Sequence, residues 1–563
     1  MINLGIDFGS TYTLVSMYNT NTQTVETLAL DQGNPYIPSV VSYDEKFKRY
    51  EFGKGAKSQT GRKGVKIFKA FKMLLTDQKG SERLVNRGFD DENTPEKISG
   101  IFLKDLLRKM LDDIGEDKIG NIYIGVPEIW NEDFKTVDGR SIVRNIFQEM
   151  DFVENARVVS EPAAASAFFA HNYKTNRGVD FHGNILLVDY GGGTLDITLT
   201  NVAACDKSDG DNSVEIKVLN RTGAGENEEG KIGKAGVVYM ETIVEKAIIR
   251  SGCLEGEELV FDTKFYKVVD QLETELQNRT ELIKDIFEEY DQDMYELESQ
   301  IFTSLDYKGD DIDISYGLLL EVYNETIRDV LDEKLQEMIT FMSDNGINWM
   351  NRECDDFKIA LVGGFGNLYL VKKQIEDKFE ISSIDLRVRD IITNRADCER
   401  AVSLGTALLA NGIIGIRNTA PYSIGVKSYD ISTGSVALIY AINYKQDIEF
   451  GRVYYPMGTD GNKFMIRSLS RSFDEFIVNF GPDDKTAFVA IPKDEFVNKL
   501  RNIIKGQYCI ALIGFSMDNS GIISVHIRDY DPIKDTLDEE HTIELTRLNE
   551  LFKITVVFGG DLQ

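Results

Sequence analysis

Residues 6–11 read Ile-Asp-Phe-Gly-Ser-Thr, and residues 188–194 read Val-Asp-Tyr-Gly-Gly-Gly-Thr. Both segments place an aspartate at the end of an apolar strand and follow it with an aromatic residue, glycine and threonine. Glycines in such a turn let backbone N–H groups approach phosphate oxygens, and the carboxylate can hold Mg²⁺ or its water ligands. Two turns of this kind that face one another predict a site that holds a nucleotide from both sides.

The bulk properties of the chain exclude several classes of protein. Its 563 residues carry a formal net charge of −30, which argues against binding to nucleic acid or to anionic membranes. This length predicts roughly three or four domain-sized units. No apolar run is long enough to span a membrane, and the first residues read as a strand and not as a secretion signal. The five dispersed cysteines contain no Cys-x-x-Cys pair, which argues against zinc or a disulfide framework and favours the cytoplasm.

Strand-like and helix-like patterns alternate from residue 2 to residue 200, which indicates an α/β fold. Within this region, the spacing of apolar residues predicts a helix over residues 65–75. Residues 240–343 read as a mostly helical insertion with an acidic outer face. A further strand over residues 358–362 leads into a glycine-rich turn and a helix.

After residue 422 the pattern changes to short alternating segments, which predict an all-β domain of about 140 residues. The turn residues Asp-Asn-Ser-Gly at 518–521 predict a hairpin between two of its strands. The strands are expected at 435–443, 463–467, 508–516, 522–528 and 541–545.

Taken together, these segments resemble the DnaK-type heat-shock chaperones, a family within the actin-like ATPase superfamily. The motifs that carry the resemblance occur in the family's order, at residues 5–12, 37–41, 160–165, 187–196, 360–364 and 400–407. The resemblance implies a two-lobed actin-like (ribonuclease H-like) ATPase fold with a duplicated core, followed by an all-β sandwich that binds substrate.

The same resemblance implies the boundaries of the domains. Lobe I would occupy residues 1–186 and lobe II residues 187–385, with a helical insertion at 240–345. A helix at 386–412 would return to lobe I, a linker would follow at 413–421, and the β-sandwich would occupy 422–563.

Catalytic roles also follow from the resemblance. Asp7 and Asp189 would lie near Mg²⁺, and Asp196 near bound cations or water. Glu161 would help to place the attacking water, and Lys72 would position the γ-phosphate. Phosphoryl transfer to water needs this kind of positioning and charge neutralisation more than it needs a strong base.

The remaining expected contacts are to the nucleotide itself. The residues that would touch phosphates, ribose or adenine are Gly9, Ser10, Thr11, Tyr12, Gly191, Gly192, Gly193, Thr194, Gly363, Gly364 and Phe365. The family's adenine-contacting lysine and arginine should fall within 264–290, where Lys284 is a candidate. The implied cofactors are ATP and Mg²⁺, with K⁺ as a further candidate cation.

Other roles compete with these assignments. Lys69 is the alternative to Lys72, and Lys72 itself could lie on a surface face. Asp7 could simply cap its turn, Glu161 could begin a helix that has proline in its first turn, and the glycines at 363–364 could form an ordinary strand-to-helix turn.

The chain also departs from the family pattern. Phe365 and Asn367 stand where the family usually has serine and arginine, so the contacts to adenine should differ. The linker residues 414–419 lack the family's leucine-rich run that ends in aspartate, which puts coupling between the domains in doubt. Beyond His541 we expect no helical lid.

The predicted function is slow ATP hydrolysis that switches the affinity of the β-domain for unfolded or extended polypeptide, assisted by co-chaperones or a nucleotide-exchange factor. An alternative is a scaffold or signalling protein that holds one fixed partner on its β-domain. A filament-forming actin relative and a small-molecule kinase of the same superfamily are weaker alternatives.

Overall fold

The computed structural model describes the greater part of the chain, and the statements below concern that part. The described residues are 1–30, 33–76, 84–85, 87–127, 130, 139–205, 214–224, 235–254, 258–290, 293–349, 356–381, 395–417, 419–420, 423–430, 435–444, 446–449, 452–457, 463, 465–467, 473–479, 486–490, 510–518, 523–531, 533–534, 536–537, 542–544 and 555–558. The chain divides into two compact units. The first comprises 1–129, 144–156 and 160–416, and the second comprises 130–143, 157–159 and 417–563.

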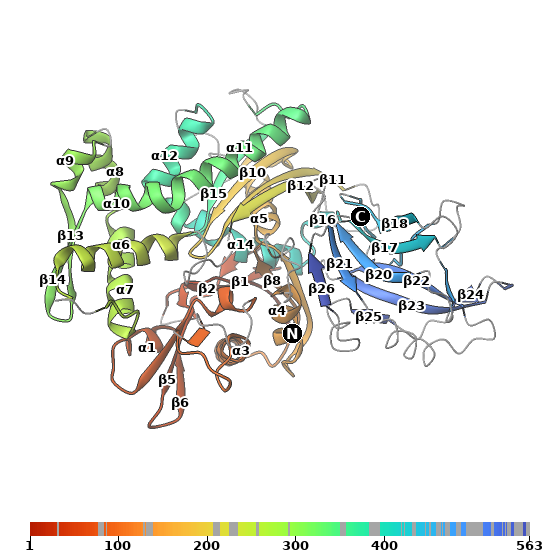
Figure 1. Cartoon of the computed structure of the whole chain (residues 1–563), viewed down its shortest axis with the longest axis horizontal. Coiled ribbons are helices and arrows are strands. Elements are labelled where there is room, and N and C mark those ends of the chain that lie inside the picture. The colour runs from red at the N-terminus through yellow and green to blue at the C-terminus, as the bar shows by residue number, and fades with distance from the viewer. Residues whose placement is uncertain are drawn as a thin grey trace. The chain divides into compact units, whose positions relative to one another are not determined.

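One sheet has the strand order β3-β2-β1-β8-β9, with β4 paired to β2. Figure 1 labels its central strands β2, β1 and β8. Strand β1 is antiparallel to β2 and parallel to β8, so that Asp7 lies opposite Leu14 on one side and Gly125 on the other. The strands are β1 (Ile2–Phe8), β2 (Tyr12–Asn19), β3 (Thr24–Thr27), β4 (Ile37–Pro38), β8 (Ile119–Val126) and β9 (Val153–Ser160).

A second sheet repeats this plan in the order β15-β10-β11-β12-β16. Strand β10 is antiparallel to β11 and parallel to β15, so that Asp189 lies opposite Asp196 and Val362. Asp7 and Asp189 therefore occupy equivalent positions in two copies of one arrangement. The strands are β10 (Gly183–Tyr190), β11 (Leu195–Ala204), β12 (Val214–Ala224), β15 (Phe357–Val362) and β16 (Gly415–Arg417).

Two helices rich in small residues pack against these sheets and against each other. Helix α5 (Glu161–Arg177) contacts β8, β10, β11 and β12, and helix α14 (Arg395–Ala410) contacts β1, β2, β8 and β15 (Figure 1). A Cβ atom on Gly405 would collide with the backbone oxygen of Ala164, and one on Gly5 would collide with the backbone nitrogen of Ala407. Glycine at these positions lets the two helices and β1 approach closely.

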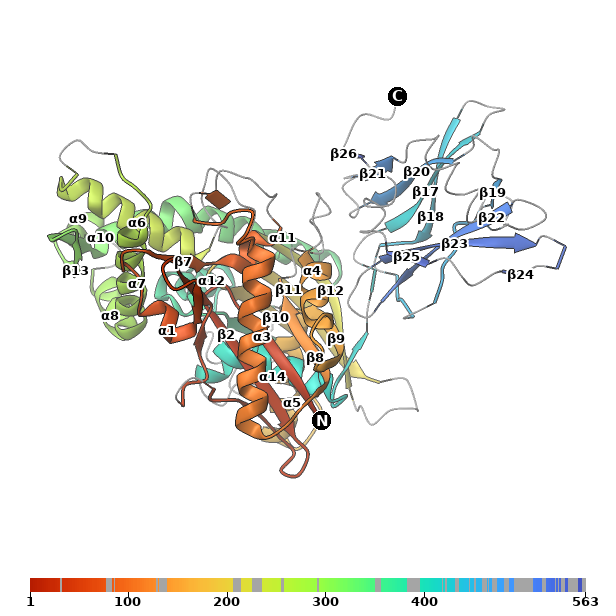
Figure 2. The same ribbon diagram turned by 90° about the horizontal axis from the view of Figure 1, so that it is seen from below.

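A smaller sheet has the order β6-β5-β7 and precedes the long helix α3 in the chain. Strands β5 and β6 are labelled in Figure 1, and β7 and helix α3 in Figure 2. The predicted helix over residues 65–75 is wrong, because Val65–Lys69 is strand β7 and Phe71–Leu74 is a 3₁₀ helix, η1. Ala70 separates the two in the left-handed conformation, with φ 51°. The remaining elements are β5 (Val40–Asp44), β6 (Arg49–Phe52), α1 (Gly53–Lys57), α3 (Pro95–Ile114) and α4 (Gly139–Gln148).

The region from residue 236 to residue 344 is mostly helical, as its sequence predicts. It also contains the antiparallel hairpin of β13 and β14, which sequence reasoning missed. Its elements are α6 (Gly236–Ser251), α7 (Thr263–Asn278), α8 (Thr280–Glu289), α9 (Met294–Glu298), β13 (Ile301–Tyr307), β14 (Asp310–Ser315), α10 (Tyr316–Tyr323), the π-helical η3 (Asn324–Arg328) and α11 (Asp329–Asp344). Strand β15 then leads through η4 (Phe365–Asn367) into α12 (Tyr369–Lys378). None of the described helices combines the length and the apolar character needed to cross a membrane.

In the described residues after 417, all regular structure is strand. Two sheets are present, in the orders β18-β17-β20-β21-β26 and β19-β22-β23-β24, with β25 paired to β23. Each of the five expected strands overlaps an observed one, and the pairing of β22 with β23 agrees with the predicted hairpin, although residues 519–521 of its turn lie outside the described part. The strands are β17 (Ser423–Asp430), β18 (Ser435–Ile442), β19 (Met465–Arg467), β20 (Phe473–Asn479), β21 (Thr486–Ala490), β22 (Ile510–Met517), β23 (Ile523–Asp531), β24 (Thr536–Leu537), β25 (Thr542–Glu544) and β26 (Thr555–Phe558). That these sheets form a sandwich stays a prediction.

Candidate nucleotide site

The first glycine turn joins β1 to β2 and is fixed by the segment that follows β4. A Cβ atom on Gly9 would collide with the backbone oxygen of Tyr12, so only glycine fits. The hydroxyl of Ser39 donates a hydrogen bond of 2.7 Å to the backbone oxygen of Gly9. The backbone N–H of Ser39 donates to the backbone oxygen of Thr11 at 2.8 Å. One buried serine therefore holds both ends of the turn.

The second turn joins β10 to β11 and is held by helix α6. The backbone N–H of Gly191 donates to the backbone oxygen of Thr194 at 3.0 Å. The first N–H groups of α6, those of Gly236 and Val237, donate to the backbone oxygens of Gly191 and Gly192 at 3.2 Å and 2.7 Å. The start of α6 thus fixes the conformation of this turn.

The two turns face each other across a cavity of about 610 Å³, a volume typical of small-molecule sites. A Cβ atom on Gly192 would lie only 2.9 Å from Oγ1 of Thr11, which measures how closely the turns approach. The predicted residues that line the cavity are Asp7, Gly9, Ser10, Thr11, Tyr12, Lys72, Glu161, Asp189, Gly191, Gly192, Gly193, Thr194, Gly363, Gly364 and Phe365.

Lys72 and Glu161 form a buried ion pair in this cavity. The Nζ atom of Lys72 donates a 2.5 Å hydrogen bond to Oε1 of Glu161, and the two side chains are 4% and 9% exposed. The alternative that Lys72 lies on the surface is therefore wrong. Lys69 instead pairs with Asp270 at 2.6 Å and does not line the cavity.

Glu161 is presented to the cavity by the N-terminus of α5. The hydroxyl of Ser160 caps this helix by accepting the N–H of Ala163 at 3.2 Å, and Pro162 stands in the first turn, where a missing N–H costs nothing. Gly125 of β8 makes room, since a Cβ there would lie 3.1 Å from Cγ of Glu161. The helix-start alternative for Glu161 is thus compatible with its place in the site.

The carboxyl groups of the site repel one another. Burial, and next the charge of Glu161, raise the pKa of Asp7 from 3.8 to about 7. Burial also raises the pKa of Asp189 well above its usual value, reinforced by the charges of Glu161, Asp196 and Asp7. The positive charge of Lys72 lowers the pKa of both aspartates and so partly offsets these increases. Lys72 is the one cation among the described residues that line the cavity. A divalent cation between the carboxylates would relieve this repulsion.

This donor set fits Mg²⁺. Hard carboxylate oxygens are its preferred protein ligands, and Mg²⁺ commonly uses only one or two of them together with waters and phosphate oxygens. Asp7 and Asp189 are therefore the residues that would hold the ion. Asp196 is buried opposite Asp189 on the neighbouring strand and does not line the cavity, so its role at a cation stays a prediction.

Sequence reasoning missed several residues of the cavity wall. Within 264–290 the lining residues are Glu273, Leu276, Gln277 and Thr280, and Lys284 is not among them. From other segments the wall adds Leu14, Asn34, Tyr36, Gly236, Met240, Asn367, Leu368, Cys398, Glu399 and Val402. Most of these lie on helices or loops whose approach to the site depends on tertiary packing, and no local motif marks them.

Comparison with known proteins finds similarity in the N-terminal part of the chain. Residues 3–207 match the family model described as Hsp70 protein. Heat shock cognate 70 kDa protein 3 of Dictyostelium discoideum is 25% identical over 226 residues, which cover 36% of this chain and 34% of that protein. A heat shock 70 kDa protein of Ajellomyces capsulatus is 28% identical over 224 residues, covering 35% of this chain and 29% of that protein. A chaperone protein dnaK of Thalassiosira pseudonana is 27% identical over 220 residues, which cover 35% of this chain and 34% of that protein.

The match thus spans about a third of the length of each of these relatives. It includes the first glycine turn, the Lys72–Glu161 pair and the second glycine turn. Over residues 3–207, the chain is similar to the Hsp70 chaperones.

Proposed function

We propose that this chain is a chaperone-like ATPase that binds ATP with Mg²⁺ between its two glycine turns and hydrolyses it slowly. The observation that carries the proposal is the approach of Gly192 to Thr11 across one cavity, with Asp7 and Asp189 at equivalent strand ends beside it. Backbone N–H groups from both turns are available to bind phosphate oxygens, and the volume of the cavity suits a nucleotide.

In this proposal the side chains of the site have separate roles. Asp7 and Asp189 hold the cation, which when bound neutralises charge on the phosphates. Lys72 neutralises Glu161 and offers its remaining ammonium protons to the terminal phosphate. The carboxylate of Glu161, fixed by Lys72, orients a water molecule for in-line attack. No strong base is needed, because the barrier is lowered mainly by positioning and by electrostatic stabilisation.

We further propose that nucleotide state is coupled to the binding of extended polypeptide by the strands of the second unit, through pairing of strand edges. Supporting the coupling, residues of the predicted linker form β16, which is the last strand of the sheet that also carries β10 and Asp189. A change in the second glycine turn can therefore reach the linker through a continuous sheet. A co-chaperone or exchange factor, and K⁺ as a second cation, belong to the same proposal.

ATP turnover measured with and without a short extended apolar peptide tests this function. Stimulation by the peptide is the expected result. Turnover that no peptide changes would favour a scaffold that holds one fixed partner. Failure of Mg-ATP to bind at all would overturn the proposal.

A further inference from the structure

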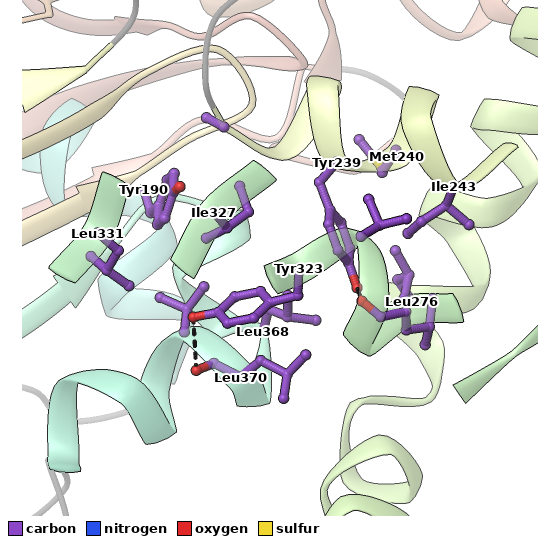
Figure 3. Close-up of a cluster of buried hydrophobic side chains, with 14 of the residues drawn as sticks. Tyr190, Tyr239, Met240, Ile243, Leu276, Tyr323, Ile327, Leu331, Leu368 and Leu370 are labelled. Atoms are coloured by element: carbon purple, nitrogen blue, oxygen red, sulfur yellow. Dashed lines mark hydrogen bonds between the residues drawn. The ribbon is translucent and has the colours of Figure 1, made fainter. Parts of the chain in front are cut away.

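One wall of the cavity is apolar, and it is continuous with the core of the second lobe. This apolar wall consists of Met240, Leu276, Phe365 and Leu368. Figure 3 shows three of these side chains, Met240, Leu276 and Leu368, in the same cluster of buried residues as Tyr190 and Tyr239. The wall is therefore backed by packed side chains of the core.

The ring of Phe365 is held on several sides. Its centroid lies 5.2 Å from that of Tyr190 in a T-shaped pair and 5.3 Å from that of Tyr239 in a tilted one. A Cβ atom on Gly236 would approach the ring to 3.0 Å, so glycine at the start of α6 makes room for it. Phe365 is half-buried and lines the cavity. Its ring is therefore both held by its neighbours and within reach of a ligand.

Charge distinguishes this wall from the rest of the site. Among the described lining residues the one cation is Lys72, and it is committed to Glu161 beside the carboxylate cluster. A guanidinium or ammonium group from the described lining is thus not available to stack on a ligand at the apolar wall. A flat, uncharged aromatic group is the ligand chemistry that packs best on an aromatic ring there.

We propose that Phe365 is the platform on which the base of the bound nucleotide packs, and that Tyr190, Tyr239 and Gly236 fix the plane of its ring. This inference rests on the proposed function, because it assigns the base of the same nucleotide whose phosphates lie between the glycine turns. Phe365 thereby contributes to affinity for the nucleoside and not to affinity for the phosphates.

Binding of three probes to the full chain separates these contributions: Mg-ATP, adenosine and Mg-tripolyphosphate, which has no base. Phe365→Ala is expected to weaken Mg-ATP and adenosine at least tenfold, within the range measured when aromatic platforms for bases are removed, and to change tripolyphosphate binding less than twofold. Phe365→Trp, which keeps an aromatic face, should bind all three probes. Phe261→Ala is the matched control, because Phe261 is 42% exposed and lies outside the cavity lining.

Unchanged binding of adenosine to Phe365→Ala would overturn the proposal, and so would an equal loss for tripolyphosphate, which would indicate a role in holding the second turn. If the alanine variant does not fold, Phe365→Leu replaces it in the same three binding measurements, with the same expected losses. Leucine still fills the space beside Gly236 but offers no aromatic face. Failure of the unmodified chain to bind Mg-ATP would instead reject the proposed function, so the two failures are distinguishable.

Discussion

The ammonium group of Lys72 lies 2.5 Å from Oε1 of Glu161 although the two residues are 89 positions apart, and both side chains are buried in the wall of the cavity. Lys72 reaches this place because β7 ends at Lys69 and a left-handed Ala70 turns the chain into η1. A pair so buried, in a cavity that also holds two carboxyl groups of raised pKa, is the arrangement expected of a functional site.

The first prediction concerns this pair. Lys72→Ala should reduce single-turnover ATP hydrolysis at least tenfold, about 1.4 kcal/mol of barrier, while Mg-ATP still binds, because the lysine acts on the terminal phosphate and on Glu161. Lys69→Ala is the matched control and should hydrolyse ATP normally, since Lys69 pairs with Asp270 outside the cavity lining. If Lys72→Ala hydrolysed ATP as fast as Lys69→Ala, Lys72 would have no role in the hydrolysis step.

Stability has to be separated from catalysis in that experiment. Removing one partner of a buried ion pair leaves the other charge uncompensated, at a cost of about 3–5 kcal/mol. The double variant Lys72→Met/Glu161→Gln removes both charges and should recover much of the thermal stability lost in Lys72→Ala without recovering turnover. Recovery of turnover as well would mean that the pair has only a structural role.

The second prediction is a pH dependence that arises from Asp7. Without divalent cations, burial and the charge of Glu161 raise the pKa of Asp7 from 3.8 to about 7 in the folded chain. The folded state then binds more protons than the unfolded state between these pH values, so the contribution of Asp7 to stability falls as pH rises from about 4 to about 7 and stays constant above that. Urea unfolding in EDTA measures it. The unmodified chain should lose stability relative to Asp7→Asn as pH rises across this range, because asparagine does not titrate. Parallel curves for the two chains would contradict the raised pKa.

The third prediction concerns the serine that holds the first turn. Ser39→Ala removes the hydroxyl that donates to the backbone oxygen of Gly9 in part-buried surroundings and accepts from the buried hydroxyl of Thr13. Unsatisfied buried groups of this kind cost about 1–3 kcal/mol, and a loosened turn should also weaken Mg-ATP. Ser58→Ala is the control, because Ser58 makes a hydrogen bond of the same type and length to Gly55 at an exposed position. Nucleotide affinity that is equal in the two variants would show that Ser39 does not position the turn.

The fourth prediction concerns the second unit. His526 is buried and hydrogen-bonded to the hydroxyl of Ser516 at 2.6 Å. Burial, helped by the charge of Arg528, lowers the pKa of His526 from 6.5 to about 4, so the folded state resists protonation. The unfolded state then binds more protons between these values, and stability is lost as pH falls from 6.5 towards 4. Thermal unfolding should show a smaller loss over this range in His526→Gln, and an identical loss in both chains would refute the assignment.

Much of this site could be predicted from sequence because its chemistry is local. The turns after Asp7 and Asp189 are encoded by glycines within a few residues of each aspartate, so they could be identified without a fold. Proline in the first turn is likewise a local signal for the start of a helix, and α5 begins at Glu161.

Other features depend on tertiary structure that no local pattern shows. The apolar spacing of residues 65–75 resembles a helix, but pairing with β5 and the left-handed Ala70 impose a strand and a 3₁₀ turn. The position of Phe365 could be read as a departure, yet its orientation depends on Tyr239 and Gly236, more than a hundred residues away. Gln277 reaches the cavity only because α7 packs beside α6.

The most direct test of the account is titration of Mg-ATP into the full chain, followed by single-turnover hydrolysis of the complex in the presence and absence of EDTA. The account predicts one nucleotide site, much weaker binding in EDTA, and slow release of phosphate that depends on Lys72 and Glu161. The absence of binding to the folded chain, or hydrolysis that persists unchanged in both Lys72→Ala and Glu161→Ala, would contradict it.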